Sequence, residues 1–213
     1  MKTRFTITSL GVITAAALAI TTLTAGARPE IQSLAADSLV PEFGTAQSTT
    51  DVLPEILQPL VDDAPLDEDS VRLIAQSSYG THWVALDANE DICIITYLKD
   101  ETAGGANCMP RAQFHAKGAS LLVGGPSGPG VVAHLLPAGL EEPAVQEAIA
   151  THDAGASEAR GIPEDNTGTA ESSVEIFADA GLVVLNENTA AALGSVHVPR
   201  AGQQDLVLYD MAP

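Results

Sequence analysis

The stretch from Trp83 to Gly118 constrains the fold of this chain more than any other. It holds both cysteines and the single tryptophan, most of a β-rich run from Thr81 to Asp87, and all of a second β-rich run from Ile92 to Leu98. Residues 88–91 read Ala-Asn-Glu-Asp, a composition that favours a hairpin turn. Apolar side chains alternate onto both faces of the second run, which predicts a central strand that is covered on both sides. We therefore expect this stretch to be a scaffold rather than a place of chemistry.

The two cysteines, Cys93 and Cys108, lie fifteen positions apart and are the only ones in the chain. In an exported protein such a pair predicts a disulfide. We expect it to join the second strand to the start of a short helix near residues 109–117. Closing a loop of this length stabilises a domain by about 3 kcal/mol in the chain-entropy model. A redox function is disfavoured because the C-x-x-C spacing of thiol oxidoreductases is absent.

The first residues have the pattern of an export signal. A basic start, Met1 to Arg4, precedes an uncharged run from Phe5 to Thr24 and the small-x-small site Ala25-Gly26-Ala27. This order predicts a signal peptide over residues 1–27 that is cut after Ala27. The uncharged run is also long enough to cross a bilayer, so an uncleaved anchor is the alternative. Either reading places the rest of the chain outside the cytoplasm, secreted or at the outer face of the cell envelope.

Charge is distributed unevenly along the chain. The sequence has 9 Lys and Arg against 28 Asp and Glu, a formal net charge of −19. Residues 30–69 and 141–213 carry most of the acids, whereas residues 70–140 are close to neutral. Nucleic acid is excluded as a partner because phosphates need clustered Lys and Arg. Anionic membrane surfaces are disfavoured for the same reason, and an acidic exterior serves solubility. The expected partner is an unidentified protein or envelope component.

Composition divides the exported part into four segments. Residues 28–66 are acidic and rich in Pro, Ala and Ser, which predicts a tether. Residues 67–152 are expected to form the compact cystine-bearing core. Residues 153–172 lose apolar periodicity and predict a linker or long loop. Residues 173–213 contain short strand-like runs, which we expect to extend the same sheet because they carry too few large apolar side chains to fold alone.

The fold class predicted is α+β, an antiparallel sheet with two or three short helices and one disulfide. The helices are expected near residues 68–77, 109–117 and 141–151, from acids in a first turn, a proline at a helix start and apolar spacing. Two further strands, residues 119–123 and 131–136, are joined by a loop over residues 124–130 that is rich in Gly and Pro.

One motif resembles a calcium loop. Asp87, Asn89 and Asp91 occupy its first three ligand positions. Ile92 stands where the sharp turn needs glycine, and Leu98 stands where the loop needs a bidentate glutamate. These acids are better interpreted as the turn of a hairpin.

Two glycine-rich patterns also fail at defined positions. The run Gly125-Pro-Ser127-Gly-Pro129 has a proline at the last glycine of a G-x-S-x-G nucleophile turn. The same glycines are not followed by the G-K-[ST] of a phosphate loop, which argues against nucleotide binding. We expect no cofactor.

The remaining reactive side chains form no local set. No two histidines lie within five positions of each other, so no local zinc pattern exists, although a site assembled from distant residues stays open; the histidines are His82, His115, His134, His152 and His197. Glu141 and Glu142 suit the start of a helix. Trp83 and Tyr97 suit a core more than a ligand platform. No catalytic, metal or cofactor-binding residue is predicted.

A short series of residues within positions 79–140 forms a pattern: Trp83 to Asp87, Ile92 to Ile94, Cys108, Phe114, Gly118 and Leu135 to Pro137. In this pattern the chain resembles a group of small exported domains of unknown function from actinobacteria. The chain departs from the pattern at Glu90-Asp91, where a glycine is expected, and at Ala138, where an aspartate is expected. The resemblance implies a non-cytoplasmic domain with a disulfide and supplies no activity.

The function expected from these features is that of a non-enzymatic extracytoplasmic domain that binds a protein or a cell-envelope partner. One alternative is a secreted hydrolase whose site forms only in three dimensions, which predicts a concave pocket that joins a histidine with serine or carboxylates. A second alternative is a secreted protease inhibitor that offers residues 103–107 or 124–130 to its target.

Overall fold

The computed structural model describes residues 34–63, 65–99, 103–124, 128–140, 142–160 and 174–208. The predicted signal peptide and most of the predicted linker lie outside these ranges. Within them, no helix has both the length and the apolar character that crossing a membrane requires.

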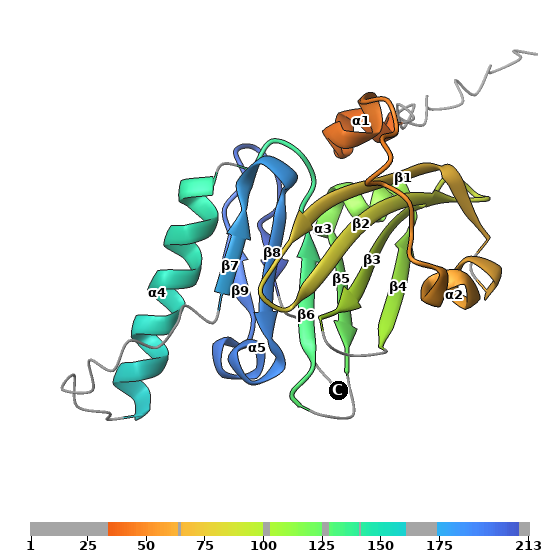
Figure 1. Ribbon diagram of the computed structural model, residues 1–213. Helices are drawn as coiled ribbons and strands as arrows, with labels where there is room; N and C mark the ends of the chain where they lie inside the picture. The colour runs from red at the N-terminus through yellow and green to blue at the C-terminus, as the bar shows by residue number, and fades with distance from the viewer. Residues whose placement is uncertain are drawn as a thin grey trace, which may run out of the picture. The chain divides into compact units, whose positions relative to one another are not determined.

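The described residues contain two four-stranded antiparallel sheets (Figure 1). The first follows chain order: β1 (Leu66–Gln76), β2 (Gly80–Asp87), β3 (Ile92–Leu98) and β4 (Gly104–Met109). The second has the order β5 (Ala119–Val123), β6 (Val131–Leu135), β8 (Leu182–Asn186) and β7 (Val174–Phe177). A two-stranded sheet pairs β9 (Val196–Val198) with β10 (Leu206–Leu208).

Helical segments occupy the connections. The α-helices are α1 (Ala36–Leu39), α2 (Gln58–Asp63), α3 (Arg111–Lys117), α4 (Glu142–Arg160) and α5 (Glu187–Leu193). Short 3₁₀ turns are η1 (Pro41–Gly44), η2 (Glu55–Leu57) and η3 (Ala178–Ala180). Antiparallel sheets, several helices and the disulfide confirm the α+β class in outline.

The main core lies between the two four-stranded sheets. Alternation along each strand sends Val84 of β2 and Ile94 of β3 to meet Ala133 of β6 and Val184 of β8, all fully buried. Phe114 of α3 is buried in the same cluster. Each such side chain contributes about 1.5–3 kcal/mol when it leaves water. This shared face joins the first half of the domain to the second.

The outer face of each sheet is covered as well. On the first sheet, Trp83 and Ile95 pack against Leu57 of the segment that precedes β1. On the second sheet, side chains of α4, α5, β9 and β10 form a separate cluster with Val183 of β8. Strand β3 is therefore buried on both faces, as the apolar side chains on both of its faces predict.

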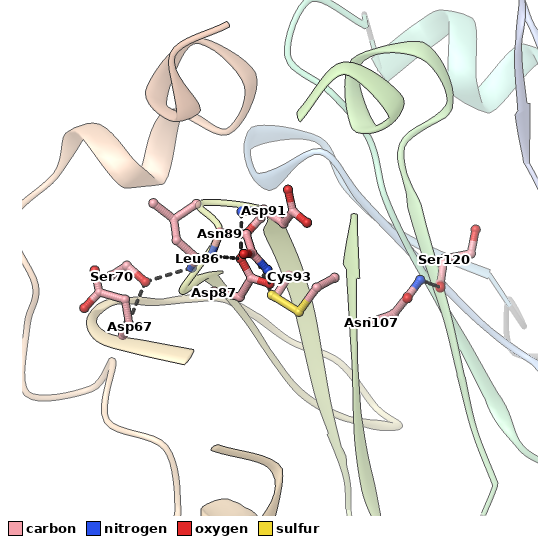
Figure 2. The surroundings of a disulfide bond; sticks show 10 residues. Asp67, Ser70, Leu86, Asp87, Asn89, Asp91, Cys93, Asn107 and Ser120 are labelled. Carbon is pink, nitrogen blue, oxygen red and sulfur yellow. Dashed lines mark hydrogen bonds between the residues drawn. A yellow bond between two sulfur atoms is a disulfide. The ribbon is translucent and has the colours of Figure 1, made fainter. Parts of the chain in front are cut away.

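The helix predicted near residues 68–77 is wrong, because β1 occupies this stretch. The acids Asp67 to Asp69 form an irregular segment of the strand, at a shift in its register with β2. Ser70 fills that irregularity, since its Oγ donates to the Asp67 carbonyl and accepts from the Leu86 N–H (Figure 2). Pairing with β2 outweighs the weak helical preference.

The expected position of Cys108 at the start of a short helix is also wrong. Strand β4 begins at Gly104, and Cys108 lies within this strand rather than at a helix start. The disulfide joins directly opposed residues of β3 and β4, with 3.9 Å between the Cα atoms of Cys93 and Cys108. A Cβ at Gly104 would lie 2.5 Å from a Leu57 methyl, so the glycine permits close packing.

Residues 34–63, part of the predicted tether, pack onto the domain and protect its edge strand. Leu39 and Val40 are buried in the main core. Gln47 Nε2 donates to the Glu68 carbonyl at 2.7 Å, and the Leu73 N–H of β1 donates to Asp51 Oδ1 at 2.8 Å. These side chains satisfy backbone groups of β1 that would otherwise recruit another strand. A composition rich in Pro and Ser gave no sign of this contact.

Asp51 provides a test of the contact. Burial alone would raise the pKa of its carboxyl, but N–H donors from Ser48 and Leu73 and the charge of Arg72 hold this pKa below its usual value. The stabilisation by Asp51 is therefore complete above the unfolded pKa of about 3.9 and is lost as pH falls through the lower folded value. We expect Asp51→Asn to lower the free energy of unfolding by about 1–3 kcal/mol at pH 7.

The measurement is urea unfolding at pH 7 and pH 2, with Asp37→Asn as the control because Asp37 is exposed. The difference in stability between the Asp51 variant and the parent should shrink as the pH falls from 7 to 2. A loss in Asp37→Asn equal to that in Asp51→Asn would contradict the proposed contact.

Candidate functional site

An open cavity of about 400 Å³ lies between the end of α3, strands β4 to β6 and the residues that lead into β10. Several polar side chains from these different elements line it: Asn107, Lys117, Ser120, His134, Gln204 and Asp205. Segments that are far apart in the sequence therefore meet at one polar hollow.

Ser120 and His134 are directly opposite each other on the paired strands β5 and β6. Both point away from the main core, because their neighbours Leu121 and Ala133 fill it. The Ser120 Oγ is hydrogen-bonded to His134 Nδ1. Ser120 is exposed, whereas His134 is only 2% exposed. The pair thus joins a solvent-facing hydroxyl to a buried imidazole.

Two backbone contacts fix the surroundings of this pair. Asn107 Nδ2 of β4 donates to the Ser120 carbonyl at 2.8 Å, which ties the edges of the two sheets together close to the disulfide (Figure 2). Gly118 has φ +67° and ends α3 against β6, where a Cβ would lie 2.5 Å from the Leu135 carbonyl oxygen. Only glycine allows both that conformation and that approach.

His134 is neutral near pH 7. Burial lowers the pKa of its imidazole to about 4, and a backbone hydrogen bond with Lys117 acts in the opposite direction. The hydrogen bond between Nδ1 and the Ser120 Oγ ties the buried ring to the cavity.

A second serine–histidine pair lies in the core and has a structural role. His82 is fully buried, with Nε2 2.9 Å from Ser77 Oγ and Nδ1 3.0 Å from Thr96 Oγ1. Ser77 Oγ also accepts from the N–H groups of Tyr79 and Gly80. This network holds the turn between β1 and β2. Burial lowers the pKa of His82 to about 4.

The acids of the calcium-like motif form a hairpin turn, as expected. Asp87 Oδ1 accepts from the N–H groups of Asn89 and Asp91 at 2.8 and 2.9 Å (Figure 2). Across the described part of the chain, no three His, Cys, Asp or Glu side chains gather where a metal could bind. The carboxylate of Asp87 is directed at its own turn.

Other residues considered in the sequence analysis lie in a side-chain cluster, in a strand or outside the described residues. Trp83 and Tyr97 belong to the cluster on the outer face of the first sheet. Residues 104–107 lie in β4, so they offer no free loop to a protease. Glu141 and residues 125–127, including Ser127, lie outside the described residues.

The Ser120–His134 pair was absent from the sequence predictions, but a signal for it existed. The predicted strands 119–123 and 131–136 flank a loop over residues 124–130. In a hairpin centred on residue 127, position 120 falls opposite position 134, which matches the observed register. Counting outward from the loop would have paired the two side chains. The contributions of Lys117 and Asp205 have no comparable local signal.

Comparison with known proteins identified no relative. No family model, curated protein or solved structure matches this chain.

The turn at Glu90 gives a test of backbone strain. Glu90 has φ 62°, in the left-handed region that favours glycine, and its carboxylate pairs with Arg111 at 2.9 Å. Glu90→Gly and Glu90→Ala both remove this exposed ion pair, but only the first relieves the backbone. We expect the glycine variant to be more stable than the alanine variant by about 1 kcal/mol. Thermal or urea unfolding measures the difference, and equal stabilities would argue against strain at this turn.

The two buried histidines predict sensitivity to acid. Their folded pKa values of about 4 lie below the unfolded value of 6.5, so unfolding takes up protons as the pH falls. Their stabilisation is complete above pH 6.5 and is lost between pH 6.5 and 4. Near pH 5 each should reduce the free energy of unfolding by about 1.4 kcal/mol per pH unit.

Urea unfolding between pH 6.5 and 5 measures this slope, above the range in which ordinary carboxylates titrate. His82→Asn, which keeps a hydrogen-bonding side chain, should reduce the slope by about half. A stability that stays constant over this range would contradict burial of neutral histidines.

Proposed function

We propose that this chain is an extracytoplasmic domain that binds a protein or cell-envelope partner, and that the cavity beside Ser120 is its binding site. The observation that carries the proposal is the convergence of polar side chains from α3, β4, β5, β6 and the segment before β10 on one open cavity. Cavities with a few converging polar groups and a histidine of perturbed pKa are typical binding sites. The Cys93–Cys108 disulfide supports an oxidising extracytoplasmic setting.

The lining limits what the cavity can accept. Lys117 and Asp205 offer one charge of each sign, and Asn107, Gln204 and Ser120 offer neutral hydrogen-bonding groups. A volume of about 400 Å³ suits one or two residues of a partner rather than a folded surface. The ligand we propose is therefore a short polar segment, such as the end of a peptide or of an envelope polymer.

The test blocks the mouth of the cavity. Gln204 lines the cavity and is exposed, whereas the adjacent Gln203 is exposed without lining it. Gln204→Trp should abolish retention of the partner from an envelope fraction by the immobilised mature domain, and Gln203→Trp should leave retention unchanged. Quantitative mass spectrometry of the retained material is the measurement. Equal retention by the two variants would place binding elsewhere, and no retention by the parent would remove the proposal.

A further inference from the structure

The two serine–histidine pairs differ in what surrounds the serine. In the core pair, Ser77 is engaged by the backbone of its own turn and His82 is sealed between the sheets. In the cavity pair, Ser120 is exposed at a hollow of about 400 Å³ and shares its Oγ with His134. Only the second serine is placed where a ligand could reach its hydroxyl.

The tautomer of His134 decides which way the Ser120 proton points. A neutral imidazole carries one N–H and one acceptor nitrogen. In the tautomer with the proton on Nε2, the Nδ1 atom accepts a hydrogen bond from the Ser120 hydroxyl. That tautomer has the arrangement of a nucleophile and a base.

We propose that Ser120 is a nucleophile with His134 as its general base, and that the cavity accepts the carbonyl group of a carboxylic ester. The proposal goes beyond partner binding, because it assigns a covalent step to the cavity. It requires both residues and leaves the rest of the cavity to position the ester.

The step is balanced without a further reagent. The Ser120 Oγ forms a bond to the ester carbonyl carbon while its proton moves to His134 Nδ1. The C–O bond to the leaving group breaks, and the departing alkoxide takes that proton from His134 and leaves as an alcohol. Water then attacks the acylated Ser120, gives its proton to His134, and releases the acid as Ser120 recovers its proton.

Donors for the developing negative charge lie on the cavity wall. Asn107 uses one amide N–H on the Ser120 carbonyl and has a second one to offer. Lys117 adds a positive charge from the end of α3, and Asp205 adds a negative charge from the segment before β10. These are the charged side chains that line the cavity around the pair.

Burial of His134 gives the reaction a distinctive pH dependence. A base with a pKa of about 4 is already neutral at pH 5, so reactivity should stay level from about pH 5 to 8. A site that depends on an ordinary histidine would instead lose activity below pH 6.5. The same burial makes the base weak, so we expect slow turnover.

The experiment uses a fluorophosphonate probe on the mature domain, with intact mass and peptide mapping. The Ser120 oxygen forms a P–O bond, the P–F bond breaks, and fluoride and a proton leave. We expect one adduct on Ser120, none in Ser120→Ala, and labelling at least tenfold slower in His134→Asn. Ser78→Ala is the matched control, because Ser78 is an exposed serine whose hydroxyl donates to Glu175 instead of to a histidine.

Hydrolysis of p-nitrophenyl acetate between pH 4 and 8 supplies the second measurement. A level rate above pH 5 that disappears in Ser120→Ala supports the proposal. An adduct on another serine, no adduct at all, or hydrolysis that survives in Ser120→Ala overturns it, and none of these outcomes requires His134→Asn to fold. Retention of an envelope partner by Ser120→Ala tests the binding proposal separately.

Discussion

Strand β3 is buried on both faces, and the rest of the domain is arranged around this burial. One face carries Ile92, Ile94 and Leu98 into the core between the sheets, and the other carries Cys93 and Ile95 outward. A strand of this kind cannot stay at a surface, because each large apolar side chain costs about 1.5–3 kcal/mol when exposed. The second sheet covers one face and the segment before β1 covers the other. The compact unit therefore has to include residues well before and well after the hairpin.

The edge between the two sheets shows how this scaffold shapes the cavity. Strand β4 is attached to β3 by the ladder and by the disulfide at Cys108. The next residue toward its start, Asn107, reaches across to the Ser120 carbonyl on β5. Gly105 allows β4 to approach, since a Cβ there would lie 3.3 Å from a Val123 methyl. The disulfide has a structural role, because it fixes the strand that positions one wall of the cavity.

Local sequence patterns predicted the elements whose pairing is local. The β2–β3 hairpin, strands 119–123 and 131–135 and the helix after Pro110 all follow from alternation, turn composition and proline placement. Strand β1 was mistaken for a helix because its acids suit a first helical turn, and its strand state depends on β2 and on Asp51. Strand β4 was not predicted, because its glycines, Gly104 and Gly105, serve close packing and give no strand signal. The cavity combines residues more than eighty positions apart, such as Lys117 and Asp205, which no periodic pattern connects.

The two buried histidines also differ in what the fold gains from them. A buried imidazole stays neutral in the folded state, whereas in the unfolded state it is hydrated and becomes charged below pH 6.5. Each buried histidine therefore lowers the stability of the fold in acid. His82 compensates by holding Ser77, whose hydroxyl in turn organises the β1–β2 turn. His134 is bonded to an exposed serine on a regular strand pair that the backbone ladder already holds. A buried histidine that is hydrogen-bonded to an accessible hydroxyl in a polar cavity is the strongest indication that this cavity has a chemical use.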